Sequence, residues 1–142
     1  MDLKIANKIA LITGSTKGIG FASAKKLASE GASVIINGRN KKNVEDAILR
    51  IQNEVKNANV LGIVADLGTK EGCDKLIQEV SHIDILINNL GIFEPKEFTK
   101  ITDDDWLTMF TTNVMSGVRL SRHYFPLMLE QRISASKFVC IP

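Results

Sequence analysis

Short apolar runs alternate with longer segments of helical periodicity through the first two thirds of the chain. The apolar runs lie at residues 9–13, 34–37, 59–65 and 83–88. Runs of this length that are rich in Val and Ile are typical of strands buried on both faces. Between them, apolar residues recur every three or four positions at residues 18–30, 41–56 and 69–80. Strands that alternate with helices predict βαβ crossovers and a parallel sheet with helices on both faces.

The pattern changes after Gly91. Residues 94–100 are predicted to form a loop, and Thr102 followed by three Asp residues is typical of a capped helix start. One helix is predicted to reach about residue 112, and a second to run from Asn113 to Glu130. Pro126 is expected to kink or shorten the second helix. Residues 137–141 then predict a fifth strand.

Composition and charge exclude several classes of protein. The 142 residues are 44% hydrophobic and 24% charged, which suits one soluble domain over residues 1–142. The net charge of +2, with basic residues scattered among acids, argues against nucleic-acid or membrane partners. No apolar run approaches the ~18 residues of a membrane span, and the chain opens without a secretory signal. Cys73 and Cys140 make no metal or redox spacing, so we expect two free thiols in a cytoplasmic protein.

The first strand leads directly into a glycine-rich turn, Thr13-Gly-Ser-Thr-Lys-Gly-Ile-Gly20, and then into the first helix. A strand, a glycine turn and a helix in this order indicate nucleotide binding. Gly14 permits the tight turn. Gly18 and Gly20 have no side chain to keep a phosphate from the backbone amides or the helix from the sheet. The helix N-terminus favours an anion. The alternative is a plain glycine-rich βα turn.

The spacing Gly-x-x-x-Gly-x-Gly resembles that of the short-chain dehydrogenase/reductase family, and Asn88-Asn-Leu-Gly91 resembles that family's Asn-Asn-Ala-Gly. The resemblance covers roughly residues 6–131. It implies the N-terminal five-strand portion of an α/β, doubly wound Rossmann sheet, in the order 3-2-1-4-5, with a nicotinamide cofactor at the carboxyl ends of strands one and four. The implied cofactor contacts are Gly14, Ser15, Thr16, Lys17, Gly18, Ile19, Gly20, Asp66, Leu67, Asn89 and Gly91. Asp66 would contact the adenine, although a helix-capping Asp would occupy the same place.

Gly38 and Arg39 bear on the choice between the two nicotinamide cofactors. A fold of this kind usually carries an acid after the second strand, about 20 residues past the glycines, to hold the ribose hydroxyls. Gly38 has that place here, and Arg39 follows it. Without the carboxylate a 2′-phosphate is not repelled, and the guanidinium can bind it while Lys17 adds a second charge. The sequence therefore favours NADP(H), the alternative being that Arg39 is a solvated turn residue.

The resemblance also assigns one catalytic position and finds others missing. Asn113 matches the family's catalytic Asn, which holds a water in a proton relay, although a mid-helix Asn can also mark a bend. The family's chemistry further needs a Ser after strand five and a Tyr-x-x-x-Lys on the next helix. Tyr124 is the single tyrosine, and Met128 stands where the Lys would be, so we expect a packed helix face. Residues 133–137, Ile-Ser-Ala-Ser-Lys, resemble the family's Tyr-Ser-Ala-Ser-Lys with Ile in place of the tyrosine. The alternatives are the trace of an internal deletion and a chance match, and we interpret it as chance because residues 138–142 are typical of a strand.

The sequence as a whole predicts a single NADP-binding Rossmann domain that is incomplete at its C-terminus. The implied activity is NADP(H)-dependent oxidoreduction of a small-molecule carbonyl/alcohol pair, impaired because the Tyr-x-x-x-Lys segment is absent. The alternative is a non-catalytic fragment that binds NADP(H) or a partner chain. In the family the helix equivalent to residues 113–130 packs against its copy, which implies a homo-oligomer. The substrate remains open.

Overall fold

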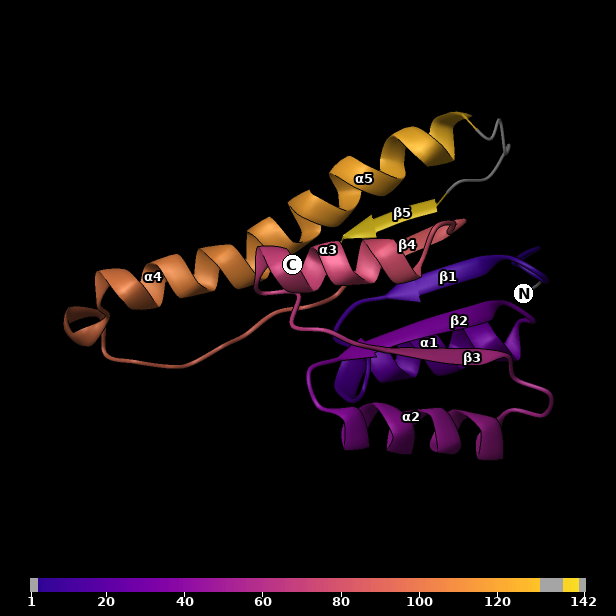
Figure 1. Cartoon of the computed structure of the whole chain (residues 1–142). Coiled ribbons are helices and arrows are strands. Elements are labelled where there is room, and N and C mark those ends of the chain that lie inside the picture. Colours follow the sequence, from indigo (N-terminus) through magenta and orange to yellow (C-terminus); the bar gives the residue numbers. More distant parts are fainter. Residues whose placement is uncertain (1–2, 131–136, 141–142) are drawn as a thin grey trace.

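The computed structural model describes residues 3–130 and, as backbone, residues 137–140 (Figure 1). Its strands are β1 (Ile9–Ile12), β2 (Ser33–Gly38), β3 (Val60–Val64), β4 (Ile85–Asn88) and β5 (Lys137–Cys140). Its helices are α1 (Gly18–Ser29), α2 (Lys41–Glu54), α3 (Lys70–Glu79), α4 (Asp103–Phe110) and α5 (Ser116–Glu130). A 3-10 turn at Phe98–Lys100 lies in the segment predicted as loop, and a π-helical turn at Thr111–Met115 joins α4 to α5.

The five strands form one parallel sheet in the order β3-β2-β1-β4-β5. This order confirms the predicted Rossmann-type arrangement. Ala10 of β1 lies opposite Val34 of β2 on one side and Ile85 of β4 on the other, so β1 is the central strand. The chain moves outward from β1 to β3 and then crosses to β4, which places the switch point of the sheet between β1 and β4. Ligands of such sheets bind beyond the carboxyl ends of the strands at that point.

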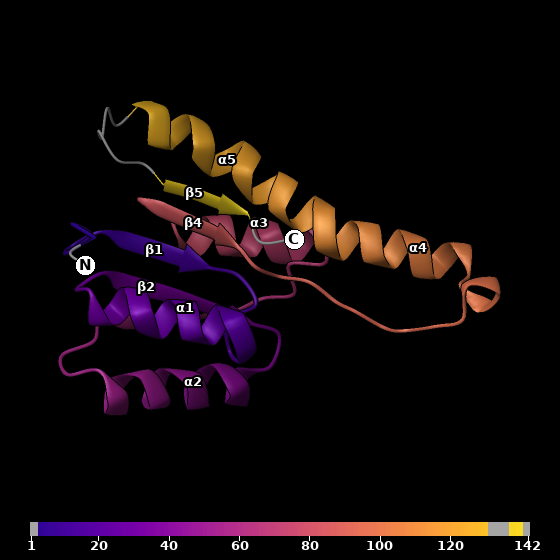
Figure 2. The same ribbon diagram turned by 180° about the vertical axis from the view of Figure 1, so that it is seen from behind.

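Two hydrophobic cores lie on opposite faces of the sheet, because successive residues of a strand point to opposite sides. One core joins Ala10 and Ile12 of β1 to α1 and α2, and the other joins Leu11 to α3 and α5. Figure 1 shows α3 in front of the sheet, and the opposite view in Figure 2 shows α1 in front. The buried side chains of α1 and α2 recur every three or four positions, as the predicted helical periodicity requires, and they include Phe21, Ala24, Ala28, Val44, Ala47 and Ile51.

The later helices differ from the prediction. We expected two helices meeting at Asn113, whereas α4, the π turn and α5 are continuous, with Asn113 inside the π turn. The flanking residues Phe110 and Ser116 both keep right-handed helical backbone angles, so one weak helix former does not interrupt the segment. Pro126 lies inside α5 without ending it, and the helix reaches Glu130 as predicted.

The fifth strand is confirmed at its backbone. Lys137 begins β5 and lies opposite Ile85 of β4 in a parallel register. The other positions of the Ile-Ser-Ala-Ser-Lys segment, residues 133–136, lie outside the described residues. Because Lys137 is in a strand, it does not occupy the helical position that the family's Tyr-x-x-x-Lys requires.

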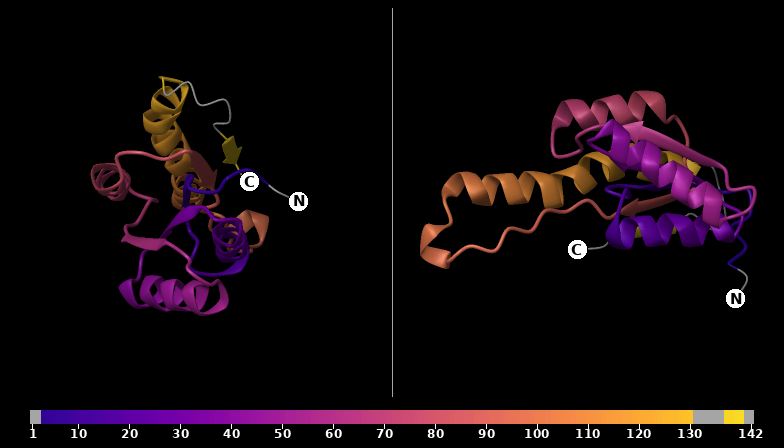
Figure 3. Two further views of the ribbon diagram at one scale, coloured as in Figure 1. Left: turned by 90° about the vertical axis from the view of Figure 1, so that its right-hand side faces the viewer. Right: turned by 90° about the horizontal axis from the view of Figure 1, so that it is seen from below.

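Helix α4 and the segment before it project away from the sheet (Figure 3). No residue of α4 is buried. Thr102 and Asp105 form a reciprocal capping box, which confirms the predicted helix start. Lys96 pairs with Asp105 at 2.7 Å and thereby ties the preceding segment to the helix. The Lys96 ammonium, together with hydrogen bonds from Thr102, lowers the pKa of the Asp105 carboxyl to about 2.

The part of the chain that the structure describes contains no helix long and apolar enough to cross a membrane. Among those same residues, no group of three or more His, Cys, Asp and Glu side chains is placed to hold a metal ion. Cys73 is a free, buried thiol in the core between α3 and α5, as predicted. The side chain of Cys140 lies outside the described residues.

Candidate functional site

A cleft of about 520 Å³ lies at the carboxyl ends of the central strands. Its walls are the glycine turn, the turns after β2 and β3, the segment after β4, and the junction of α4 with the π turn. The predicted site residues that line this cleft are Gly14, Thr16, Lys17, Arg39, Asp66, Leu67 and Gly91. The cleft therefore brings together residues from four separate segments at the edge of the sheet where a Rossmann fold binds its ligand.

The glycine turn is built from three glycines with different requirements. Gly14 and Gly18 have φ angles of +59° and +60°, which L side chains rarely adopt. A Cβ at Gly20 would lie 2.8 Å from the carbonyl oxygen of Gly14 and would also collide with the side-chain amide of Asn89. A Cβ at Gly18 would meet no described atom within 4 Å. Gly20 is thus required by packing inside the protein, whereas Gly18 faces open space.

The N-terminus of α1 differs from those of the other α-helices that begin after a turn. Asn40, Thr69 and Thr102 cap α2, α3 and α4 through their side chains. At α1 the N-cap is Lys17, and no described side chain accepts a hydrogen bond from the first turn. The N–H groups of residues 18–20 have no partner within the helix, because a helix leaves its first amides unpaired. With the helix dipole, these donors make this end of α1 suited to an anion.

Ser15 faces inward, away from the cleft. Its hydroxyl donates to the carbonyl oxygen of Ile12 at 2.6 Å and accepts from the backbone N–H of Asn37 at 2.9 Å. Its own N–H donates to the carbonyl oxygen of Asn37 at 2.9 Å. Ser15 is fully buried, so its side chain holds the turn against β2.

Asn37 is a residue of the site that the sequence analysis did not identify. It is the last residue but one of β2, is 1% exposed, and its side-chain oxygen accepts from the N–H of Gly14 at 3.2 Å. Its side-chain nitrogen donates to the carbonyl oxygens of Ile63 at 3.2 Å and Ala65 at 3.1 Å. The available signal was a polar residue at the end of an otherwise apolar strand.

Thr13 and Asn89 join the glycine turn to the segment after β4. The Thr13 hydroxyl accepts from the backbone N–H groups of Asn89 and Leu90, each at 2.9 Å. The side-chain nitrogen of Asn89 donates to the carbonyl oxygens of Thr13 and Gly14, each at 3.0 Å. Asn88, its neighbour, donates instead to the Ser121 hydroxyl of α5 at 3.1 Å. The predicted residue Asn89 therefore braces the turn.

Two cations stand at the mouth of the cleft. Lys17 and Arg39 are both exposed and both line it. Gly38 is the last residue of β2 and precedes Arg39, and a Cβ there would approach Thr16 Cγ2 to 2.6 Å and Val44 Cγ2 to 3.1 Å. The side chain of Thr16 therefore packs closely over Gly38 and leaves no room for an acidic side chain at this position.

Asp66 and Leu67 form the wall after β3. The carboxylate of Asp66 accepts from the N–H of Gly68 at 3.0 Å, within the turn. The cap of α3 is Thr69, so the alternative of Asp66 as a helix cap is wrong. Leu67 is 1% exposed and packs in the core with Cys73, so only its backbone is available to a ligand.

Asn113 lies beside the cleft without lining it. Its side-chain oxygen accepts from the N–H of Ile92 at 2.7 Å, and its nitrogen donates to the carbonyl oxygen of Ile92 at 3.0 Å. The amide thus fastens the segment after β4 to the π turn. Asn113 also lines a second hollow of about 840 Å³ along α5, whose apolar lining includes Val118 and Phe125.

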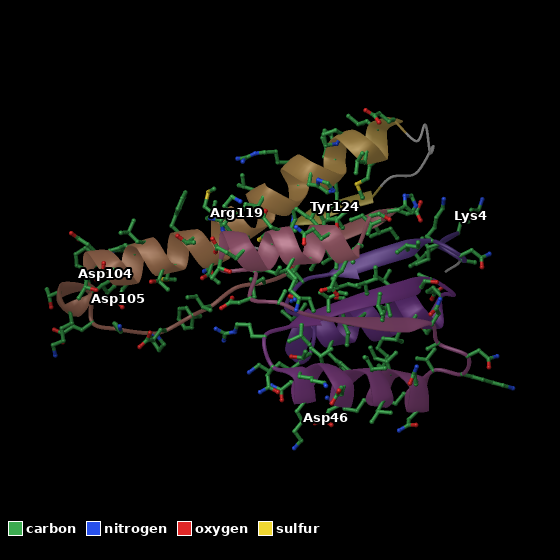
Figure 4. The ribbon with its side chains drawn as sticks, viewed as in Figure 1. Lys4, Asp46, Asp104, Asp105, Arg119 and Tyr124 are labelled. Atoms are coloured by element: carbon green, nitrogen blue, oxygen red, sulfur yellow. The ribbon has the colours of Figure 1, made fainter. Side chains whose placement is uncertain are left out.

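Tyr124 belongs to the core, as predicted. Its hydroxyl donates to the carbonyl oxygen of Val80 at 2.7 Å, and the residue is 1% exposed. Burial raises the pKa of this hydroxyl above its ordinary value. Figure 4 shows Tyr124 on α5, and Asp104 and Asp105 at the distant end of α4. Because the Tyr124 hydroxyl is buried and donates its proton to the Val80 carbonyl oxygen, it cannot reach a substrate in the cleft.

Comparisons with known proteins agree with this geometry. Residues 8–136 match the family model described as short chain dehydrogenase. The chain is 49% identical to the uncharacterized oxidoreductase YvaG of Bacillus subtilis, over 93% of this chain and 50% of the relative. It is 33% identical to the 3-oxoacyl-[acyl-carrier-protein] reductase FabG of Aquifex aeolicus, over 93% of this chain and 54% of the relative.

Among solved structures, an L-sorbose reductase from Gluconobacter frateurii, complexed with NADPH and L-sorbose, superimposes with a TM-score of 0.86. Its sequence is 32% identical, and the match covers 92% of this chain and 51% of the reductase. The chain thus spans about half the length of the curated relatives it matches.

Proposed function

Because the chain belongs to the short-chain dehydrogenase/reductase family, whose members are oxidoreductases, we propose that its cleft binds NADP(H) and serves reduction or oxidation of a carbonyl/alcohol pair. The observation that carries the proposal is the N-terminus of α1. It has no side-chain cap, and its first residue is Gly18, which faces open space at the switch point of the sheet. The pyrophosphate binds there, against the amides of Thr16 to Gly20.

The adenosine half of the cofactor lies toward β3 and α2. Arg39 and Lys17 bind the 2′-phosphate that distinguishes NADP(H) from NAD(H), the guanidinium through paired hydrogen bonds. Gly38 supports this choice because it supplies no carboxylate to the ribose. The turn at Asp66 and the backbone of Leu67 hold the adenine. The complex of the related L-sorbose reductase with NADPH is consistent with this assignment.

The nicotinamide half lies toward Asn89, Gly91 and Asn113. When bound, NADPH supplies the hydride, and this chain's part is to hold the cofactor and exclude competing contacts. Asn113 is proposed as the catalytic position. Its side-chain amide holds the segment after β4 through two hydrogen bonds to the backbone of Ile92. Tyr124 is withdrawn into the core, and the 142 residues contain no Tyr-x-x-x-Lys. We therefore propose that these residues alone catalyse weakly, as one single-domain unit that binds NADP(H).

A non-catalytic, associating fragment is the second candidate. The observation in its favour is an exposed apolar strip along α4, the π turn and α5. Its more exposed members are Trp106, Leu107, Phe110, Val114, Phe125 and Leu129. Monomeric proteins rarely leave a large contiguous apolar patch in water. Helix residues 113–130 are accordingly proposed to pack against a second copy of the chain, and sedimentation equilibrium over a concentration series tests this.

The decisive experiment is titration of the 142-residue chain with NADPH and with NADH by calorimetry. NADPH is expected to bind more tightly, and Arg39→Ala to reduce its affinity by about 1.5–3 kcal/mol, the range for a hydrogen bond to a charged group. NADH affinity should stay constant in that variant. Lys42→Ala removes an exposed cation of α2 that does not line the cleft, and serves as the control. Equal dissociation constants for the two cofactors in the wild type would refute the choice of NADP(H).

A further inference from the structure

We propose that Asn37 is a positioning residue that holds the two walls of the cleft at a fixed spacing. The consequence for cofactor affinity rests on the proposed function, whereas the contact that causes it exists in the protein alone. One wall is the glycine turn after β1, and the other is the turn after β3 that contains Asp66. Asn37 is the last residue but one of β2, the strand between β1 and β3.

A single side-chain amide bridges these walls. Its oxygen accepts from the N–H of Gly14 on one side, and its nitrogen donates to the carbonyl oxygens of Ile63 and Ala65 on the other. Because the amide group is planar and 99% of the residue is out of water, the two walls cannot separate or rotate without breaking one of these bonds. The residue thus acts on the cofactor through the backbone that it holds.

The bridge also decides which amides of the turn face the cleft. Gly14 donates to the Asn37 side chain, and Ser15 donates to the Asn37 carbonyl oxygen. The N–H groups of Gly14 and Ser15 therefore point into the fold. The N–H groups from Thr16 onward remain for the phosphates. Without the side chain, the part-buried N–H of Gly14 would lose its acceptor, whereas the N–H of Ser15 would keep the backbone carbonyl oxygen of residue 37.

Few other side chains can replace this amide. The site needs an acceptor toward Gly14 and a donor toward two carbonyl oxygens. A carboxylate in Asn37→Asp would set a second oxygen against both carbonyls, and Asn37→Ala removes every side-chain bond. A serine hydroxyl is too short to reach partners on both walls.

The test on the protein alone is amide hydrogen exchange, followed by NMR, in the wild-type chain and in Asn37→Ala. The Gly14 N–H is expected to exchange about tenfold faster in the variant, a factor that corresponds to loss of one buried hydrogen bond. The Ser15 N–H, whose acceptor is the backbone of Asn37, should keep its rate and is the internal control. An unchanged rate at Gly14, or equal acceleration at both amides, would overturn the proposal. If Asn37→Ala does not fold, Asn37→Ser is measured with the same expectations.

The test on binding is calorimetric titration of the same variants with NADPH and NADH. Both dissociation constants are expected to rise by about tenfold to 100-fold, the order expected when a misaligned backbone donor loses one hydrogen bond to a charged phosphate. Their ratio should stay constant, because the walls hold the parts that the two cofactors share, whereas Arg39→Ala changes the ratio. Ile51→Ala, a buried change in α2 outside the cleft, controls for lost stability and should leave both constants unchanged.

Wild-type affinity in a folded Asn37 variant, or the same loss in Ile51→Ala, would overturn the proposed role. If the wild-type chain binds neither cofactor, the proposed function fails, and the exchange rates of Gly14 and Ser15 still decide the role of Asn37.

Discussion

Replacing Gly18 by valine tests whether this glycine is needed for cofactor binding or for the stability of the fold. Within the described residues, a Cβ at Gly18 meets no atom within 4 Å, so the fold has room for a side chain. The cost to stability comes from the φ of +60°, which an L residue adopts at about 1–2 kcal/mol. We expect Gly18→Val to fold, with a melting temperature lowered by several degrees.

Binding of NADPH should suffer far more than stability. The valine would stand between the pyrophosphate and the first amides of α1. Loss of two hydrogen bonds to a charged phosphate, at about 1.5–3 kcal/mol each, amounts to about 3–6 kcal/mol. This corresponds to a rise in the dissociation constant of about 10²-fold to 10⁴-fold. Calorimetric titration at several concentrations of variant measures it, with circular dichroism to confirm the fold.

Gly31→Val is a matched control for this experiment. Gly31 follows the other end of α1 and has a φ of +86°, so its substitution carries a similar backbone strain. A Cβ there would contact Ala6 at an ordinary 3.4 Å, away from the cleft. The control should lose comparable stability and bind NADPH normally. A folded Gly18→Val chain that binds NADPH as the wild type does would show that the phosphates lie elsewhere.

Three further outcomes are expected. In an NADPH oxidation assay against a panel of ketones and aldehydes, the 142-residue chain should turn over more slowly than about 1 s⁻¹, the low end for typical enzymes. A faster turnover rate that falls in the Asn113→Ala variant would contradict this expectation. Tyr124→Phe leaves the buried Val80 carbonyl oxygen without its donor, so chemical denaturation should show a loss of about 1–3 kcal/mol, while NADPH affinity stays unchanged. The folded-state pKa of Asp105 is about 2, below its ordinary 3.8, so its capping contribution is complete above about pH 4 and is lost as the pH falls through 2. NMR titration of the Asp105 carboxyl should show that midpoint, and Lys96→Ala should move it toward 3.8; an unmoved midpoint would exclude the ion pair as its cause.

The elements that the sequence predicted best are those set by local chemistry. Apolar runs and helical periodicity located β1 to β5 and α1 to α3 to within a few residues, and the alternation of strands with helices predicted a parallel sheet. The strand order itself was implied by the family resemblance. Thr102 was recognised as a helix start because capping depends on residues only three positions apart. The glycine turn was found for the same reason, since its backbone requirements are local to the motif.

The tertiary structure alone decided how polar groups of the site are paired. Thr13 and Asn89 are 76 residues apart in the chain, and Asn37 and Ala65 are 28 apart, so their hydrogen bonds exist only once β1, β2, β3 and β4 are neighbours. A buried polar side chain must find its partner among whatever strands surround it, and periodicity does not contain that information. The same reason explains why the lack of a side chain at Gly20 is needed to leave room for the Asn89 amide. It also explains why the Ser15 hydroxyl points inward, toward Ile12 and Asn37. The amide of Asn113 likewise pairs with the backbone of Ile92, 21 residues earlier in the chain. The sequence determined where a nucleotide site could form, and the packing of the strands determined which atoms are left to face it.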